Sequence, residues 1–369
     1  MCLFGAFAHA EESVPSLLAF SRDFLGIELP ETIFSTRGDV RENSAVIARE
    51  YEKARPFYEG CCSRAAIEEM VSTEEGRFLR LGDIRGYLVV KVLYAYSNSK
   101  YDLLPESLQC LFDYAEITLR YSRTKSDIIS YTGFVEDILD LIYMYDLVRY
   151  LQEEDLDAVF NSLLRIVNRN DDILIDLNDI LEVGRLRLEV ECAQLSESRR
   201  IWDRFRKWRY KRNDTLEKKG VFLADAINYV IEKVSVNGYY LEYVPYKTIA
   251  LKRWHQYPHS HLDVEGAESR LGPFYSRKNK ALVTLWACAV YRYKEHHGEL
   301  PVSLQDIILS ELFEGAKDDG LNKNSVVTNL PLVYSVDRTC FTVMGGPEYR
   351  SLQGCQGKPV GETFYFGCG

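Results

Sequence analysis

The sequence predicts a mainly α fold, a multi-helix antiparallel array followed by a small α+β C-terminal domain with a short β-hairpin. From about residue 31 to 234, apolar residues recur at helical steps of three and four. With 46% hydrophobic and 27% charged residues, the chain has ample material for a buried core. Its 369 residues favour two domains. We therefore expect a signal-peptide remnant at 1–10, a helical domain at 11–271 and an α+β domain at 272–369.

The N-terminus has features of an export signal. A short apolar run ends in Ala8-His9-Ala10, with small residues at the two positions that a signal peptidase reads. Cleavage is expected after Ala10. No Lys or Arg precedes the run, which a start codon assigned too late would explain. The segment predicts a periplasmic or secreted protein; the alternative is a cytoplasmic protein with a mildly apolar N-terminus.

The cysteines agree with an oxidising compartment. Nine are present, and removal of Cys2 with the signal leaves an even number. Cys340, Cys355 and Cys368 are disulfide candidates whose connectivity stays open. Cys288 lies on an apolar helical face and is predicted to be a buried thiol.

A helix from Gly133 to Leu151 illustrates the pattern of the first two thirds of the chain. Its apolar stripe consists of Ile138, Leu141, Ile142, Tyr145 and Val148. Such a stripe must be buried against neighbouring helices, which is why an antiparallel array is expected.

The last third begins with a strong helix at Lys278–His297. Gly298 is expected to end it in a left-handed conformation, and Pro301 prevents continuation. A shorter helix is predicted near Ser303–Leu312. Two strands forming a hairpin are predicted at Leu330–Val336 and Cys340–Met344.

The helix that starts near Asn279 and the following HHGELPVSLQD, residues 296–306, resemble the soluble part of type II secretion major pseudopilins. Similar tails follow helical regions in uncharacterised secreted bacterial proteins. The resemblance covers only the C-terminal third, and the family's transmembrane helix and processing site have no counterpart here. It implies an envelope location and an α+β tail, and it brings no catalytic residue.

The segment from Arg199 to Lys219 has ten Lys or Arg residues against three carboxylates. Aromatic anchors flanked by arginine predict an interaction helix for a protein partner or an anionic surface. The alternative is a surface helix whose aromatic residues face the core and whose charges are balanced by an acidic stripe at 172–182. The candidate binding residues are Arg199, Arg200, Trp202, Arg204, Phe205, Arg206, Trp208 and Arg209.

Two segments are candidate metal sites. His255, His259 and His261 with Asp263 form a loop that has ligands suited to zinc, and a solvated loop is the alternative. Oxygen ligands suited to calcium alternate in a second loop, for which an ordinary exposed turn is the alternative. These candidates are Asp318, Asp319, Asn322 and Asn324. Some pseudopilins carry calcium near their C-terminal loops.

The remaining patterns limit the function. GxSxG, HExxH, P-loop and GxGxxG motifs do not occur. A net charge of −10 disfavours nucleic acid as a partner. The longest apolar stretch, Ala281–Tyr291, is too short to cross a bilayer.

We predict a non-enzymatic exported protein without a resident cofactor that binds another macromolecule in the cell envelope, such as a toxin-neutralising immunity protein or a secretion accessory. The alternative is a metal-dependent hydrolase that uses the histidine loop.

Overall fold

The computed structural model describes residues 37–59, 63–72, 74–121, 125–169, 186, 260–313, 324–326, 331–337, 340–347 and 361–366. It is mainly helical, which confirms the predicted class. The helices are α2 (Arg37–Glu42), α3 (Ser44–Tyr58), α4 (Arg64–Ser72), α5 (Glu74–Ser97), α6 (Leu104–Tyr121), α7 (Lys125–Tyr145), α8 (Glu153–Asn168), α13 (Ser260–His297) and α14 (Leu309–Leu312). Short 3-10 helices are η3 (Tyr101–Leu103), η4 (Leu147–Tyr150) and η5 (Leu304–Asp306), and the strands are β1 (Val333–Asp337), β2 (Cys340–Pro347) and β3 (Gly361–Phe366).

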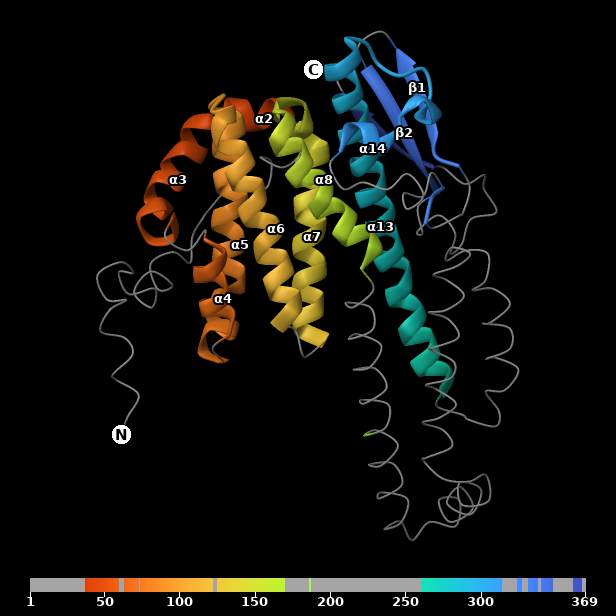
Figure 1. The fold of residues 1–369 in the computed structure, drawn as a ribbon. Helices are drawn as coiled ribbons and strands as arrows, with labels where there is room; N and C mark the ends of the chain where they lie inside the picture. The colour runs from red at the N-terminus through yellow and green to blue at the C-terminus, as the bar shows by residue number, and fades with distance from the viewer. Residues whose placement is uncertain are drawn as a thin grey trace, which may run out of the picture.

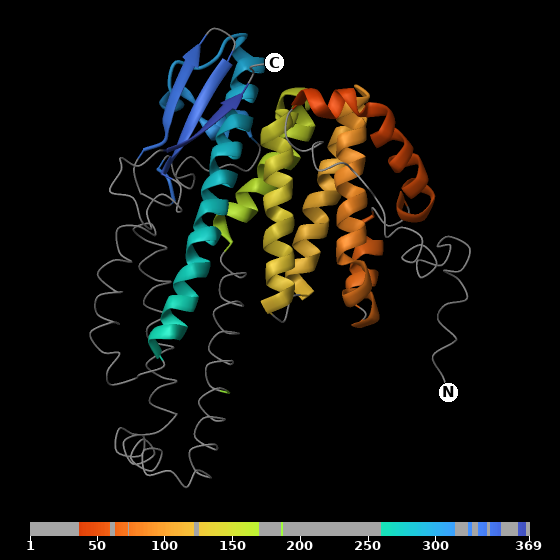
Figure 2. The same ribbon diagram turned by 180° about the vertical axis from the view of Figure 1, so that it is seen from behind.

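The long helices stand side by side (Figures 1 and 2). Helix α5 packs against α3 and α6, and α6 packs against α4, α7 and α8. Helix α13 packs against both α7 and α8 and also contacts β2. None of the described helices has the length and apolar character needed to cross a membrane.

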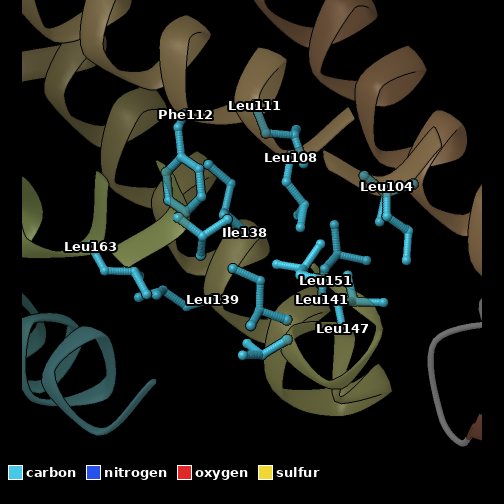
Figure 3. Close-up of a cluster of buried hydrophobic side chains, with 14 of the residues drawn as sticks. Leu104, Leu108, Leu111, Phe112, Ile138, Leu139, Leu141, Leu147, Leu151 and Leu163 are labelled. Carbon is cyan, nitrogen blue, oxygen red and sulfur yellow. The ribbon is translucent and has the colours of Figure 1, made fainter. Parts of the chain in front are cut away.

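The predicted apolar stripe of α7 lies in the core, where all five of its residues are buried. Leucines of α6 and the side chains of Leu147 and Leu151 surround it (Figure 3). The helix itself ends at Tyr145 instead of the expected Leu151, because Asp146 adopts a left-handed conformation with φ 51° and ψ 45°. The 3-10 helix η4 then continues the buried face through Val148.

Helix α13 begins at Ser260, whereas the sequence predicted a start at Lys278. It runs without a break across residues 271 and 272, so the expected domain boundary falls inside a helix. Every residue from Ala281 to Val290 is buried on all sides of the helix. A helix that is apolar all round must be covered all round. Helices α7 and α8 and strand β2 provide that cover.

The end of α13 follows the sequence prediction closely. Gly298 has φ 79°, and its N–H donates to the Lys294 carbonyl at 2.8 Å. The helix expected at Ser303–Leu312 is instead divided into η5 and α14, because Ile307 and Ile308 are extended. Ser303 and Asp306 form a capping box that fixes the start of η5.

The strands form an antiparallel sheet in the order β1-β2-β3. Val336 pairs with Phe341, and Thr342 pairs with Tyr365. Phe366 at the end of β3 is buried, and its ring packs edge-on against Tyr143 of α7. The sheet therefore shares the hydrophobic core of the helices.

Polar contacts join α13 to α7 and α8 within this apolar environment. The Tyr291 hydroxyl donates to the buried Asp146 carboxylate, at 2.7 and 2.9 Å from its two oxygens. Arg292, also buried, lies 2.5 Å from Glu153 Oε1 and donates from Nε to the Leu312 carbonyl at 3.1 Å. Lys280 pairs with Asp140.

Replacement of Tyr291 by phenylalanine should lower the free energy of unfolding by about 1 to 3 kcal/mol, because hydrogen bonds to a buried carboxylate are lost. Urea unfolding followed by circular dichroism measures this change. Tyr293→Phe is the control, since phenylalanine can keep the ring stacked on His297. It should change stability by less than about 0.5 kcal/mol. Equal effects of the two variants would contradict a stabilising role for the Asp146 contact.

The buried thiol predicted at Cys288 is confirmed, since its side chain is fully buried and free of a disulfide. Burial raises its pKa far above the ordinary value of 9.0, and the Asp146 carboxylate adds to the effect. Because the thiolate is the reactive form, Cys288 should resist iodoacetamide in the folded protein and react in urea. Peptide mass spectrometry reads both states, and rapid labelling without urea would contradict the buried position.

Candidate functional site

Most residues singled out by the sequence lie outside the described part of the structure. These are the interaction-helix candidates from Arg199 to Arg209, the ligands His255, His259, Asp318, Asp319 and Asn322, and the cysteines Cys355 and Cys368. In the described residues there is no disulfide, and Cys340 lies in β2, where it pairs with Asp337.

The loop predicted for the histidine ligands is wrong for His261 and Asp263, because α13 already includes both residues. Ser260 is the first residue of this helix. Asn324, a calcium candidate, forms an antiparallel bridge with Pro331. Among the described residues, no group of three or more His, Cys, Asp or Glu side chains could hold a metal ion.

A cluster of charges instead brings together α4, α6 and α8. Glu116 of α6 lies at its centre, with 17% of its side chain exposed. Its Oε1 accepts from Arg64 Nη2 at 3.0 Å and from Arg120 Nη2 at 3.3 Å. Arg165 Nη1 lies 3.7 Å from Oε2. We call these four residues the Glu116 network.

Two further carboxylates, Asp113 and Glu68, contact the arginines of this network. Arg64 Nη1 donates to Asp113 Oδ1 at 3.1 Å, and Arg120 pairs with Glu68. Arg64 of α4 is thus held by two carboxylates of α6. Arg120 of α6 is held by Glu68 of α4 and by Glu116, one turn away on its own helix.

The helical repeat explains why these side chains share a surface. Asp113, Glu116 and Arg120 follow one another at steps of three and four on the partly exposed face of α6. Arg165 and Arg169 are four residues apart at the end of α8, where positive charge is favoured by the helix dipole. The contacts of α6 with α4 and α8 then bring the three faces together.

The arginines keep Glu116 ionised. Burial by itself would raise the pKa of the Glu116 carboxyl. The hydrogen bond from Arg64 and the positive charges of Arg165, Arg64 and Arg169 outweigh that effect, so the pKa is lower than its ordinary 4.5. The same hydrogen bond raises the pKa of Arg64.

Beside the network, a small depression with a cavity volume of about 20 Å³ opens between α6, α7 and α8. Its lining residues are Phe112, Ala115, Glu116, Tyr131, Ser162, Arg165, Ile166 and Arg169. Phe112, Ala115, Tyr131 and Ser162 are buried, whereas half of the Arg165 side chain is exposed. The depression thus lies between buried side chains and guanidinium groups and has room for about one water molecule.

No protein-family model, curated protein or solved structure matches this chain. The candidate site is therefore defined only by the contacts among its own residues.

Sequence reasoning missed this site because its parts are far apart in the chain. About fifty positions separate Arg64 from Glu116, and a similar distance separates Glu116 from Arg165. The available signals were the four-residue spacing of Arg165 and Arg169 and the charged steps on α6. Neither signal shows which helices are neighbours.

Replacement of Glu116 by glutamine should lower the free energy of unfolding by about 1 to 2 kcal/mol at about pH 7, because the network loses its central charge. A carboxyl group whose pKa is lowered by folding contributes stability above its unfolded value of 4.5, and that stability is lost as the pH falls through the folded value. The difference between wild type and Glu116→Gln should therefore shrink between about pH 6 and pH 3. Urea unfolding at each pH measures it.

Glu136→Gln is a matched control, since Glu136 is exposed on α7 outside the network. Its effect should stay below about 0.5 kcal/mol. A Glu116→Gln effect that remains constant down to about pH 3 would contradict the ionised, arginine-paired carboxylate.

Proposed function

We propose that this chain is a non-enzymatic binding protein that holds an acidic protein partner. One observation carries the proposal: Arg64, Arg120, Arg165 and Arg169 come from three helices and form a single cluster around Glu116. We call these four residues the arginine surface. The side chains of Arg64, Arg120 and Arg165 are 42%, 48% and 50% exposed, so a partner can reach them.

The chemistry of arginine favours a protein partner with carboxylates. A guanidinium has five N–H donors in a planar arrangement that matches a carboxylate, and arginine is enriched among residues that dominate binding energies. Carboxylates within the surface hold the guanidinium groups in place before a partner arrives, which reduces the entropy lost on binding. The four arginines outnumber the carboxylates that contact them, Glu68, Asp113 and Glu116, by one positive charge. The chain as a whole has a charge of −10 and repels an acidic partner elsewhere, so this local excess orients the partner.

The proposed location is the periplasm or the extracellular space. It is supported by the N-terminal segment, and it agrees with the resemblance of the tail to pseudopilins. In this proposal the helical part is an antiparallel array that presents the arginine surface, and the part of the chain after α13 adds a small α+β unit with a hairpin. A toxin-neutralising immunity protein and a secretion accessory are its two concrete forms.

The basic segment from Arg199 to Lys219 is the second part of the proposed interface. Its arginines and aromatic residues have the same chemical preference for an acidic partner. Charge reversal of Arg204, Arg206 and Arg209 tests whether it contributes to capture of the same partner.

The double charge reversal Arg165→Glu and Arg169→Glu should weaken the partner's retention by about tenfold or more, since two attractions become repulsions. The full-length protein is immobilised, an envelope extract is passed over it, and retained proteins are quantified by mass spectrometry. The supporting result is loss of a specific acidic protein whose retention by wild type also falls as salt increases.

Arg55→Glu with Arg149→Glu is the matched control, because both arginines are exposed, lie outside the arginine surface and change the net charge equally. This control should retain the partner as wild type does. Equal losses of retention for the two double variants would show that the effect comes from net charge alone. That result would contradict a defined binding surface.

A further inference from the structure

A second polar cluster lies at the end of the helical array, where α2 crosses the end of α5 (Figures 1 and 2). The guanidinium carbon of Arg41, from α2, lies 5.3 Å from the centre of the Tyr96 ring of α5. The Tyr150 ring of η4 meets Tyr96 edge-on, with 6.0 Å between the ring centres. Tyr101 of η3 stacks on Tyr150, with 4.2 Å between the ring centres. We call these four residues the Arg41 cluster.

The turns that lead to the two stacked tyrosines have an uncommon backbone conformation. In the described part of the chain, the only non-glycine residues with positive φ are Ser99 and Asp146. Ser99, with φ 55°, lies between the end of α5 and Tyr101, at a position where helices usually have glycine. Asp146 precedes η4, which ends at Tyr150. Backbone strain of this kind is concentrated at binding sites.

The polar groups of the Arg41 cluster are available to a ligand. Arg41 is exposed, and no carboxylate of a described residue pairs with it. It differs in this respect from Arg64 and Arg120, which are held by carboxylates. Tyr101 and Tyr150 are partly exposed, and their hydroxyls form no hydrogen bond with another described residue. The guanidinium and the two hydroxyls therefore have N–H and O–H donors for a ligand.

These groups lie close enough together to act on one another electrostatically. The pKa of Arg41 is raised, chiefly by Tyr96, and Tyr101 and Tyr150 add to the effect. The pKa of Tyr150 is raised above its ordinary 10.0, first by burial and then by Tyr101 and Tyr96. Tyr150 therefore keeps its hydroxyl proton at neutral pH. The cluster thus presents neutral hydroxyl donors around one positive charge.

Donors from three separate chain segments favour a ligand with several acceptor oxygens. A guanidinium forms two parallel hydrogen bonds with a carboxylate or with a phosphate. A carboxylate that accepts both bonds from Arg41 places its two oxygens in the guanidinium plane. A tetrahedral phosphoryl group has a further oxygen outside that plane, where hydroxyls from other segments can donate to it. Because Tyr101 and Tyr150 come from η3 and η4, we favour the phosphoryl group.

We propose that the Arg41 cluster binds a phosphoryl group. Two of its oxygens accept hydrogen bonds from Arg41, and a further oxygen accepts from the hydroxyls of Tyr101 and Tyr150. Two sources present this group: a soluble phosphate monoester and the headgroup of an anionic phospholipid. The Arg41 cluster shares no residue with the arginine surface, so this inference goes beyond the proposed function and does not depend on it.

The test uses the folded full-length protein and phenyl phosphate as the probe. Isothermal titration compares phenyl phosphate with benzoate, which has a carboxylate, and with benzyl alcohol, which has no charge. Phenyl phosphate should bind about tenfold or more tightly than either of the other two compounds, because it pairs with Arg41 and both hydroxyls. Benzoate that binds as tightly as phenyl phosphate would overturn the assignment of a phosphoryl group.

Variants of the cluster test each group separately. Arg41→Gln should weaken phenyl phosphate about tenfold or more, because the positive charge is lost. Tyr101→Phe with Tyr150→Phe keeps both rings and removes both hydroxyls, and it should weaken the probe by a similar factor. If Arg41→Gln binds phenyl phosphate as wild type does, the inference is wrong.

The matched controls are Arg55→Gln and Tyr293→Phe, one for each kind of substitution. Arg55 is exposed on α3, and Tyr293 of α13 stacks on His297, so both lie outside the cluster. Neither control should change binding of phenyl phosphate, and circular dichroism shows that each variant is folded. Losses in the controls equal to those in the cluster variants would contradict a site at Arg41.

Vesicles distinguish the two sources of the phosphoryl group. Vesicles of phosphatidylcholine with and without phosphatidic acid are mixed with the protein and separated by flotation. Binding that requires phosphatidic acid and is lost in Arg41→Gln supports a lipid headgroup. Binding of phenyl phosphate without binding of either vesicle supports a soluble monoester. Failure of both phenyl phosphate and phosphatidic acid to bind would overturn the inference and leave the proposed function unaffected.

Discussion

The complete burial of α13 between Ala281 and Val290 is the constraint on which the rest of the structure depends. A helix that exposes no face to water needs neighbours on every side. Helices α7 and α8 supply part of that cover, and β2 supplies another part. Each side chain in such a core loses contact energy when its neighbours move apart, so the α13 interfaces hold helices and strands in one cluster.

Apolar packing alone leaves the rotation and the axial position of a helix weakly defined, and polar contacts define them here. Tyr291 meets Asp146 only if the left-handed turn after α7 lies at the correct height on α13. Arg292 reaches both Glu153 and the Leu312 carbonyl. Since a buried charge without partners is costly, alternative positions of α13 are disfavoured by these contacts. A similar arrangement occurs at the protein's exterior, where Glu116 of α6 contacts arginines of α4, α6 and α8 and thereby connects the three helices.

Local rules predicted the features that depend on a few neighbouring residues. The α7 stripe, the buried Cys288 thiol and the left-handed Gly298 all follow from spacing or from glycine chemistry. The start of α13 was missed because Gly272 and Pro273 favour a break, yet the helix continues to the buried Phe274 and Tyr275. The arginine surface was missed for a different reason, since it exists only when α4, α6 and α8 become neighbours. Sequence periodicity identifies the exposed face of each helix but not its partner.

The late position of α13 in the chain determines when the core around it can form during translation. Helices α3 to α7 contact mainly helices that are close to them in the chain, so they can pack soon after they leave the ribosome. Asp146 and Tyr291, by contrast, are 145 positions apart. The apolar sides of α7 and α8 must therefore wait for a helix that is translated much later. During that interval they are a target for chaperones and for aggregation, and slower translation between Asn168 and Ser260 would prolong the exposure.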